Sequence, residues 1–561
     1  MTSRRNLRSI LSLLLVSIVF LEGCGKSASE AAPIAPSHSE ESMALGQPNF
    51  EKMGRSDRSN LEYTAVRSFS SDAEIKEELI TSSGKDENAL LVSDGTVSVI
   101  GSEIVRDSSD SSGGDNASFY GVGSTALCTA GKLEINNSKI TGNANGAAGA
   151  FAYGDGTIEI SNSEIHTFQG ASGGIHVAGG GTLYANNVTA VTEGQSSAAI
   201  RSDRGGGLLV VDGGSYTSNG IGSPAVYCTA NICVKDADLN ATGSEAVCIE
   251  GFNNLYLYNS NLSGAMKDNE QNECTWNVIL YQSMSGDSQI GNSTFQMEGG
   301  QLKASNGGMF YTTNTESTFV LKDVDLIPAE NSPFLLRCTG NKNARGWGKS
   351  GENGADCVFT AISQNMSGNV QWDSISTLSM YLTEGSVLEG SIVQDDSCAG
   401  TGGNGYADLY MDDSSKWIVT ESSCLRCLSC EGSIIDENGQ SVSIVSQDGT
   451  ILRRGESNYT ITVDEFNTSA NLSGATELTA FEDAQVNNGG TAQMGAGFPP
   501  EMPNGDFNGQ QPPEMPNGDF NGQQPPEMPN GGFNGQQPPE MPNGGFNGQQ
   551  PPEMPNNEHQ N

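Results

Sequence analysis

Apolar residues recur along residues 90–330 in one fixed pattern: a first position, a second two residues later and a third seven residues later. Four residues after the first apolar position, every unit has glycine, asparagine or aspartate. These residue types tolerate a left-handed backbone conformation. The pattern therefore predicts a short strand, a left-handed corner and a second short strand, repeated along the chain. The apolar triplets are Val97/Val99/Ile104, Leu133/Ile135/Ile140, Ile158/Ile160/Ile165, Leu183/Ala185/Ala190, Leu209/Val211/Tyr216, Ile232/Val234/Leu239, Leu255/Leu257/Leu262, Phe295/Met297/Leu302 and Phe319/Leu321/Leu326. The corner residues are Gly101, Asn137, Asn162, Asn187, Gly213, Asp236, Asn259, Gly299 and Asp323.

Most units follow one another after 23–26 residues, and a third short apolar segment precedes the unit. Three strands then make one coil, and stacked coils bury a continuous apolar column that no single coil could bury. The sequence therefore predicts an all-β fold, a parallel β-helix with three short strands per coil and a ladder of Asn and Gly corners. An array of β-sandwiches, the alternative, would not repeat its corner residue at this period. The third segments contain Leu127, Ala152, Ile175/Val177, Ile200, Val226 and Val247/Ile249.

The repeated corner resembles that of the right-handed parallel β-helix in pectate-lyase-like proteins, where Asn or Gly joins the second and third strands. The resemblance covers roughly residues 84–480 and implies the same fold. Residues 416–434, with the skeleton Trp-x-Val-Thr, Leu-x-x-Leu and Gly-x-Ile, also resemble the last coils of autotransporter-adhesin-like β-helices. Residues 448–450 and 459–463 are then expected to form a closing hairpin, because an open end is a template for edge pairing. Lyases, phage spikes and adhesins share this architecture, so the fold alone selects no function.

The N-terminus reads as an export signal. Three arginines within residues 1–8 precede an apolar run over residues 10–21, which is shorter than a membrane-spanning helix. Leu21, Gly23 and Cys24 resemble the lipobox of bacterial lipoproteins, although Glu22 departs from it. The resemblance implies a signal peptide over residues 1–23, a lipid (palmitate) on Cys24, and attachment to the bacterial membrane at the cell surface. An ordinary secretory signal with an incidental cysteine is the alternative.

Polar segments flank the predicted β-helix. We expect residues 24–83 to be a flexible linker, because residues 25–60 are rich in Ser, Ala, Glu and Pro and lack an apolar period. We expect residues 481–561 to be a disordered tail, because proline and glycine at their density prevent helix and sheet. A plain spacer and a weak binding segment are the two alternatives for this tail. It repeats Pro-Pro-Glu-Met-Pro-Asn-Gly-Asp-Phe-Asn-Gly-Gln-Gln from Pro499, Pro512, Pro525 and Pro538, with Gly for Asp in the last two copies.

Charge narrows the range of partners. The 561 residues contain 67 Asp and Glu against 27 Lys and Arg, which gives a net charge of −40. Phosphate backbones repel such a chain, so nucleic-acid binding is nearly excluded.

The 12 cysteines become eleven in the exported body once Cys24 carries lipid. Two pairs are plausible disulfides: Cys228 with Cys233 across a corner, and Cys338 with Cys357 around an insertion. Cys424, Cys427 and Cys430 are expected to be buried as small apolar residues. The chain has only four histidines, which leaves little for a Cys/His zinc site.

A candidate ligand-binding face follows from the resemblance. In pectate lyases the third strand set lines the groove, and here insertions at residues 105–124, 263–277 and 339–357 would wall it. Its outward side chains, expected in solvent, suit an anionic polysaccharide because aromatic rings stack on sugars and Arg forks hold carboxylates. The predicted ligand-binding residues are Phe151, His176, Arg201, Tyr227, Arg337, Arg345 and Trp347, with Glu250, Lys342 and Lys349 on the same side.

The sequence favours a non-catalytic adhesin or carbohydrate-binding protein. A lyase of this fold needs clustered carboxylates for calcium beside a basic residue, and a hydrolase needs several aspartates in the groove. Asp107, Asp110 and Asp115 offer only a weak calcium loop, and no other cofactor is predicted. The alternatives are a polysaccharide lyase or glycoside hydrolase, and a purely structural surface spacer.

Overall fold

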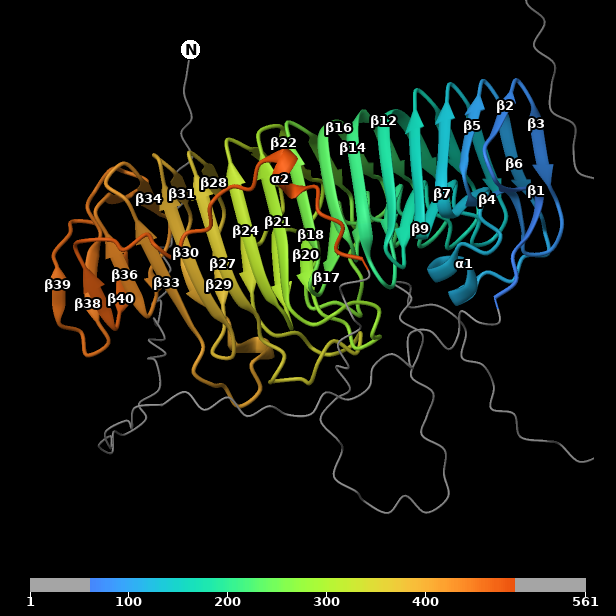
Figure 1. Cartoon of the computed structure of the whole chain (residues 1–561). Helices are drawn as coiled ribbons and strands as arrows, with labels where there is room; N and C mark the ends of the chain where they lie inside the picture. The colour runs from blue at the N-terminus through green and yellow to red at the C-terminus, as the bar shows by residue number, and fades with distance from the viewer. Residues whose placement is uncertain (1–60, 490–561) are drawn as a thin grey trace, which may run out of the picture. The chain divides into compact units, whose positions relative to one another are not determined.

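The computed structural model describes residues 61–489, which form one stack of coils made of short strands (Figure 1). Equivalent strands of successive coils pair in parallel. For example, β12 (Gly181–Thr192) lies between β9 (Ala150–Ser161) and β14 (Gly207–Ser218), with parallel register on both sides. The predicted all-β parallel β-helix is confirmed.

Each coil contributes a strand to three sheets, here called sheets I, II and III in chain order. Sheet I contains β1 (Thr64–Ser70), β4 (Glu87–Asp94), β11 (Ile175–Ala178), β13 (Ile200–Ser202), β15 (Val226–Cys228), β17 (Val247–Glu250), β20 (Trp276–Tyr281), β23 (Gly308–Thr313), β26 (Leu336–Cys338), β29 (Val370–Trp372) and β32 (Ile392–Gln394). Sheet II contains β2 (Ala73–Lys76), β5 (Thr96–Ile100), β18 (Asn254–Tyr258), β21 (Asn292–Glu298), β24 (Glu316–Lys322), β27 (Asp356–Ile362), β30 (Thr377–Thr383), β33 (Tyr406–Met411), β36 (Cys427–Cys430) and β41 (Glu465–Asn467).

Sheet III contains β3 (Leu79–Ser82), β6 (Glu103–Asp107), β8 (Lys139–Asn143), β10 (Glu164–Thr167), β19 (Asn261–Gly264), β22 (Gln301–Ala304) and β25 (Asp325–Ile327), and it continues as β28 (Asn365–Ser367), β31 (Val387–Glu389), β34 (Lys416–Val419) and β37 (Ser433–Asp436). Some long strands belong to two sheets. β7 (Ala126–Asn136) and β9 run from sheet I into sheet II, whereas β12, β14 and β16 (Asn231–Ala241) run from sheet II into sheet III.

The corner between sheets II and III matches the sequence pattern at every predicted position. All nine corner residues have a positive φ, between 47° and 75°. Their side chains also form the expected ladder: Asn187 Nδ2 donates to Asn162 Oδ1 at 2.9 Å, and Asn259 Nδ2 donates to Asp236 Oδ1 at 2.6 Å. The left-handed corners are confirmed.

A serine ladder, which the sequence pattern did not predict, runs beside these corners. The backbone N–H of Ser102 donates to Ser138 Oγ at 3.2 Å, and the N–H of Ser138 donates to Ser163 Oγ at 3.0 Å. These serines are at most 5% exposed. They satisfy backbone donors that the sharp corner leaves without a strand partner.

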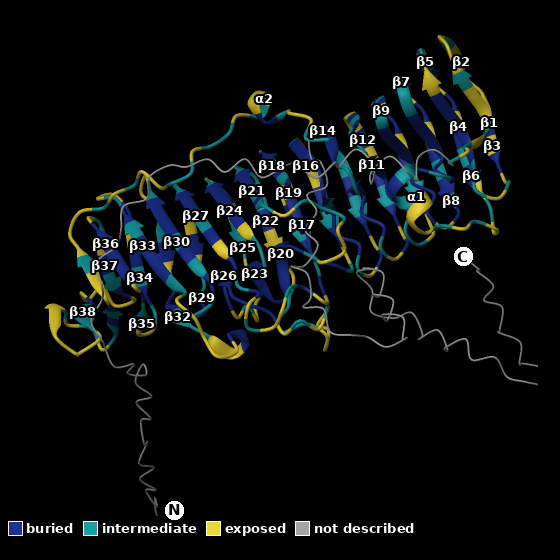
Figure 2. Cartoon of the chain, turned by 60° about the horizontal axis from the view of Figure 1, so that its bottom comes forward, coloured by how far each residue is buried: buried dark blue, intermediate teal, exposed yellow. Residues whose placement is uncertain are grey.

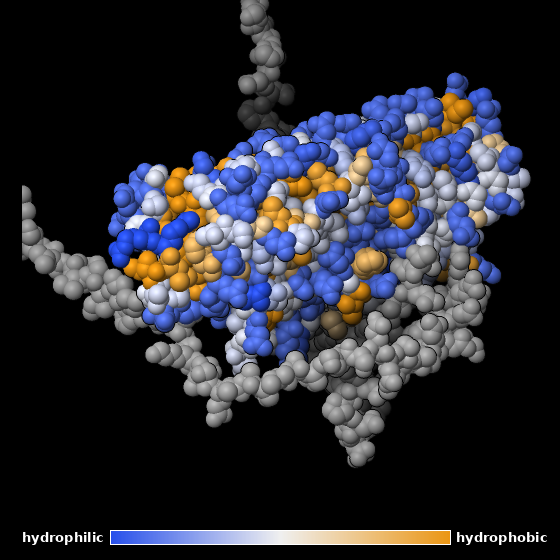
Figure 3. Space-filling model, turned by 60° about the vertical axis from the view of Figure 1, so that its left-hand side comes forward, coloured by the Kyte–Doolittle hydropathy of each residue, from blue (hydrophilic) through white to orange (hydrophobic). Residues whose placement is uncertain are grey.

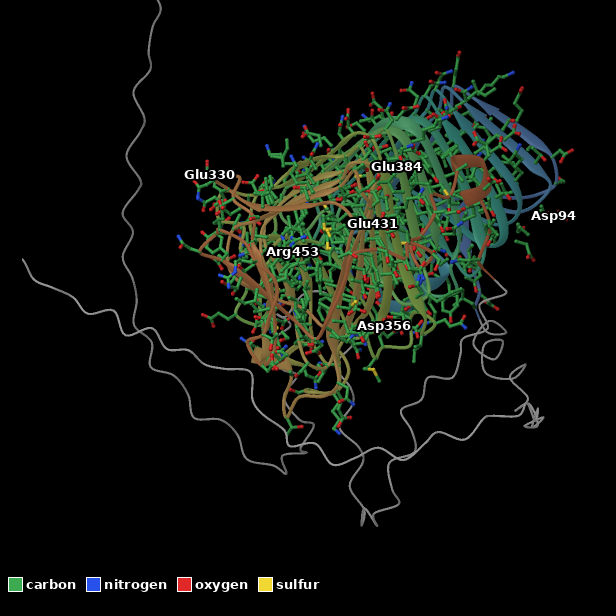
Figure 4. All side chains as sticks on the ribbon, turned by 90° about the vertical axis from the view of Figure 1, so that its left-hand side faces the viewer. Asp94, Glu330, Asp356, Glu384, Glu431 and Arg453 are labelled. Carbon is green, nitrogen blue, oxygen red and sulfur yellow. The ribbon has the colours of Figure 1, made fainter. Side chains whose placement is uncertain are left out.

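The core is a column of apolar side chains enclosed by the three sheets, and the strands that surround it are largely buried (Figure 2). It contains a stack of Phe295, Phe310, Phe319 and Phe359, with ring centroids 5.4–6.2 Å apart. All four rings are fully buried, which contributes roughly 2 kcal/mol each to stability. Seen from the left-hand end of Figure 1, the coils lie behind one another, with Arg453 and Asp94 labelled among the side chains (Figure 4).

The β-helix begins earlier than predicted. β1, β2 and β3 pair in parallel with β4, β5 and β6, so the assignment of residues 64–83 to the flexible linker is wrong. The corner of this first coil is Glu77, with a φ of 54°. Glutamate is uncommon in the left-handed region, so the corner pattern could not reveal this coil.

The far end is closed by a small cap that the sequence predicted in part. β38 (Ser443–Ser446) and β39 (Ile451–Arg453) form an antiparallel hairpin whose connection contains residues 448–450, in place of the expected hairpin between residues 448–450 and 459–463. β40 (Thr460–Val463), however, pairs in parallel with β38 and with β35 (Ser423–Cys424). The second half of the expected hairpin is therefore another parallel strand.

Beyond β41 the chain runs back across the outer face of sheet II as a strap, residues 468–489, which includes the short helix α2 (Phe481–Ala484) (Figure 1). Gln296 of β21 accepts from the backbone N–H of Thr479 at 2.9 Å and donates to its carbonyl at 2.8 Å. The strap therefore binds through its backbone as well as its side chains.

The strap is held as far as the middle of the stack. Asn231 Nδ2 donates to the carbonyls of Ala484 and Val486 at 2.5 and 2.7 Å. Asn488 Oδ1 accepts from the backbone N–H of Gly207 at 3.1 Å. Residues 481–489, which we assigned to the tail, thus belong to the folded body. The tail repeats, the linker before residue 61 and Cys24 lie outside the described residues.

Candidate functional site

The predicted ligand row exists as a row. Phe151, His176, Arg201 and Tyr227 occupy equivalent positions on successive strands of sheet I. The next residue in register is Cys248 rather than Glu250, which lies two residues further along β17. The sequence pattern therefore found the correct strands and the correct side of each strand.

The row is not in solvent, and this correction removes the predicted groove. The exposed fractions are 0% for Phe151, 1% for His176, 9% for Arg201 and 7% for both Arg337 and Trp347. The expectation that these side chains are exposed is wrong. Only Tyr227 and Arg345 of the predicted residues are half-buried.

The insertions predicted to wall the groove instead cover it. Around Trp347 a second apolar cluster forms outside the coils, with Tyr281 at 4.5 Å and Trp276 at 6.1 Å between ring centroids. Near the other end, Phe151 and Tyr153 join a third cluster, against which Tyr120 of α1 (Gly114–Tyr120) packs. Aromatic residues on both loop and strand remove each other from water, which is why the loops close down.

The arginines of the row are compensated within the protein. Arg201 Nε lies 2.8 Å from Asp203 Oδ2, and its NH1 donates to the carbonyls of Ala171 and Ser196 at 3.1 and 2.9 Å. Burial would raise the pKa of Asp203, but the charge of Arg201 and contact with His176 hold it below its usual value. Burial lowers the pKa of His176 to about 4, so this histidine is neutral at neutral pH.

The other cations of this side are also engaged. Arg337 NH1 lies 2.8 Å from Asp395 Oδ2, and Arg345 Nε donates to Asn272 Oδ1 at 2.6 Å. Lys342 and Lys349 are exposed, and Lys349 pairs with a neighbouring glutamate. The cluster we expected to bind an acidic polysaccharide therefore has little unpaired positive charge to offer.

Glu250 is the most perturbed carboxyl group under the loops. It is 2% exposed and accepts hydrogen bonds from Tyr281 Oη at 2.9 Å, from Tyr227 Oη at 3.2 Å and from Ser283 Oγ. Burial raises the pKa of Glu250 to about 7. The nearby cavity, lined in part by Phe252 and Asp287, has a volume of about 20 Å³, which suits one water molecule and no sugar.

The part of the chain that the structure describes contains no assembled site for metal binding or thiol chemistry. Between residues 61 and 489 no group of three or more His, Cys, Asp or Glu is arranged to hold a metal ion. In the predicted calcium loop, Asp107 accepts from Asn143, and Asp110 lies 3.7 Å from Lys85. The eleven cysteines described are free thiols in this structure; Cys427 and Cys430 are buried as expected, whereas Cys424 is half-buried.

A different aromatic cluster lies on the outer face of sheet II, near the cap. Tyr381 and Tyr410 are in register on β30 and β33, and their rings stack with centroids 4.9 Å apart and planes 11° apart. Tyr410 Oη donates to Asp408 Oδ2 at 3.3 Å. We call Tyr381, Tyr406, Asp408, Tyr410 and Arg426 the tyrosine patch.

The tyrosine patch also contains an ion pair, Arg426 with Asp408. Arg426 pairs with Asp408 through two hydrogen bonds, and its guanidinium lies 3.2 Å from the centroid of the Tyr406 ring. The hydrogen bonds that Arg426 donates to Asp408 raise the pKa of Arg426, so the cation persists at any physiological pH. The side chain of Arg426 is 43% exposed, and Tyr406 and Tyr410 are half-buried. Here aromatic and charged groups reach solvent together.

Sequence reasoning missed this patch although a signal existed. In β33 the order Tyr-Ala-Asp-Leu-Tyr-Met alternates polar or aromatic residues with apolar ones. That period of two places Tyr406, Asp408 and Tyr410 on one face of a strand. The strand lies beyond residues 90–330, the part of the chain that carries the apolar repeat.

The outer face of sheet III is polar. Side chains in register form hydrogen-bonded rows along it: Asn143 Nδ2 donates to Asp107 Oδ1 at 3.0 Å, and Asn219 Nδ2 donates to Glu193 Oε2 at 3.0 Å. A further row, largely exposed, contains Glu103, Lys139, Glu164, Thr189, Ser215, Asp238, Asn261, Gln301 and Asp325.

Comparison with known proteins gives no match, either to a protein-family profile, to a curated protein or to a solved structure. None of the helices between residues 61 and 489 is long and apolar enough to cross a membrane.

Proposed function

We propose that this protein is a lipid-anchored, non-catalytic carbohydrate-binding protein of the bacterial cell surface, in which the stack of coils presents the tyrosine patch. The export signal and Cys24 support the surface location. The tyrosine patch supports the binding role, because a sugar ring presents flat C–H faces to aromatic rings and hydroxyls to a carboxylate–guanidinium pair.

The structure favours a neutral carbohydrate as the ligand, in place of the acidic polysaccharide expected from the sequence. The buried arginines of sheet I are paired, and the chain has a net charge of −40. A neutral carbohydrate pays no electrostatic penalty on such a surface, whereas an acidic polysaccharide would be repelled. The surface in Figure 3, a mosaic of hydrophilic and hydrophobic side chains, suits a ligand that is itself amphipathic.

A glycan array with the full chain tests this proposal. Tyr410→Ala removes one ring of the stacked pair and should weaken binding of a neutral glycan about 5- to 10-fold, since an aromatic contact contributes roughly 1 kcal/mol. The matched control is Tyr184→Ala, which removes an outward tyrosine of the same sheet that is 38% exposed. Equal losses in both variants, or binding restricted to acidic glycans, would contradict the assignment to the patch.

The competing functions have their own readouts. A polysaccharide lyase or hydrolase would release unsaturated or reducing ends, and Glu250 would be its first candidate acid because its pKa is raised to about 7. At 2% exposure Glu250 has no open path to a polymer in this conformation. A structural spacer would bind no glycan at all.

The anchor is tested separately. Cys24→Ser removes the atom to which the lipid would be attached. The variant should move from the membrane fraction into the medium, as measured by detergent-phase partitioning. A variant that stays in the detergent phase as fully as the parent would refute the lipoprotein assignment while leaving the binding proposal intact.

A further inference from the structure

We propose that Cys338 and Cys357 are joined by a disulfide bond in the exported protein. Cys338 ends β26 and Cys357 lies near the start of β27, and both side chains belong to the core column, with exposed fractions of 0% and 1%. The sequence left two cysteine pairs open, and only the geometry separates them. This inference goes beyond carbohydrate binding and does not depend on it.

In the preceding coil, the two positions equivalent to Cys338 and Cys357 hold side chains that contact each other. Thr312 is in register with Cys338, and Ser317 is in register with Cys357. The hydroxyl groups of Thr312 and Ser317 face each other, with an oxygen–oxygen distance of 2.8 Å. A disulfide needs Cβ atoms about 3.5–4.5 Å apart, and a hydroxyl pair in contact brings its Cβ atoms to about that separation.

The two thiols follow the same geometry. Contact with the Cys357 thiol raises the pKa of the Cys338 thiol, and Cys338 Sγ also donates to the carbonyl of Thr377 at 3.6 Å. In the other candidate pair, Cys228 Sγ donates to the carbonyl of Ala230 at 3.2 Å, whereas Cys233 Sγ donates to the carbonyl of Ala484 in the strap at 3.2 Å. The register with the hydroxyl pair one coil earlier therefore favours Cys338 with Cys357.

The bond would staple the insertion that covers sheet I. In the preceding coil the two corner positions are separated by residues 313–316, but here they enclose residues 339–356, including Trp347. A disulfide removes conformational freedom from the unfolded chain, and it removes more when the enclosed loop is longer. The proposed disulfide therefore closes a long insertion, where its stabilising effect is larger than in the shorter connection of the preceding coil.

The chemistry requires an oxidant of the export compartment. Each thiol loses a proton, the S–S bond forms, and the electron pair reduces the disulfide of a thioredoxin-class thiol oxidase to a dithiol. Because both sulfurs are inaccessible in the finished fold, this exchange has to occur before the coil closes. The completed bond is then shielded from external reductants.

A thiol count tests the proposal on the full chain, produced with its own signal and denatured in alkylating reagent directly from cells. We expect nine of the eleven described cysteines to be alkylated without reductant, and all eleven after reduction. Mass spectrometry of the unreduced digest should find the peptides of Cys338 and Cys357 linked. Alkylation of all eleven without reductant, or linkage of either residue to another cysteine, would overturn the proposal.

Limited trypsin cleavage gives an independent readout, because Lys342 and Lys349 are exposed within the enclosed loop. Cleavage there should leave two fragments that migrate together on a denaturing gel without reductant and separate with it. The double variant Cys338→Ser/Cys357→Ser should separate under both conditions and still fold, since two hydroxyls already occupy this corner one coil earlier. Parent fragments that separate without reductant would exclude the bond.

Discussion

Sheet I and sheet II both carry outward side chains in register, but these side chains are covered to different extents. On sheet I the row from Phe151 to Arg337 is covered by insertions and acts as a second core. On sheet II, Tyr406, Tyr410 and Arg426 of the tyrosine patch reach solvent beside a thin strap, although Tyr381 is buried. The covering segments differ: the insertions bring large aromatic side chains such as Trp347 onto sheet I, whereas the strap binds through its backbone and through side chains such as Phe481 and Asn488.

The largest effect is expected from removing Trp347, the ring that holds the insertion at residues 339–357 against sheet I. Trp347→Ala should lower the free energy of unfolding by about 3–5 kcal/mol, because a large buried aromatic is replaced by a cavity. Phe252→Ala, at a ring that is 49% exposed, should cost less than about 1 kcal/mol. Chemical denaturation measures both. An unchanged unfolding midpoint for Trp347→Ala would mean that the loop stands open in solution.

The second test uses pH. A glutamate in an unfolded chain titrates near pH 4.3, whereas the pKa of Glu250 in the fold is raised to about 7 by burial. Between these values the folded state retains a proton that the unfolded chain has released. The free energy of unfolding should therefore fall as pH rises from about 4 to 7, by roughly 3 kcal/mol from this group.

The matched variant for this test is Glu250→Gln, which keeps an acceptor for Tyr281 but cannot titrate. The difference in unfolding free energy between parent and variant should change across this pH range, and each pH point needs its own denaturation curve. A difference that stays constant from pH 4 to 7 would show that the Glu250 carboxyl is in contact with water, contrary to a closed sheet I.

The smallest expected effect concerns the ladder that both faces share. Asn162→Val should destabilise the fold by about 1–3 kcal/mol, because valine is strained at a φ of 49° and the hydrogen bond from Asn187 is lost. Ser161→Val, one residue earlier and within β9, should cost less. Thermal unfolding of both variants measures their losses of stability, and equal losses would mean that the left-handed corner is not at residue 162.

The sequence predicted the inside of this protein better than its outside. Inward positions repeat with the coil, so nine corner residues sufficed to predict the column and the register of Phe151, His176 and Arg201. Whether an outward side chain meets water depends on loops of irregular length, for which the repeat carries no information. Trp276 and Trp347 were the available signal, since two tryptophans on a loop and the strand beneath it favour burial.

The two ends were misjudged for a related reason. Glu77 replaces the usual Asn or Gly at the first corner, so the pattern begins one coil too late. The strap has no apolar period, because the hydrogen bonds of Gln296 and Asn231 to its backbone hold it in place. Contacts of that kind leave no trace in the strap's own composition.

The strap also decides how tension would travel through the molecule. The described chain ends at Gly489, beside Gly180 and Gly207, so a pull on the following residues acts on the flank of the stack and not on its cap. Such a load would open the strap as a zipper opens, first at Asn487 and Asn488, then at Asn231, then at Gln296. Only after the contacts with Thr360 and then Glu431 failed would force reach the coils at the far end, which bear no load until then.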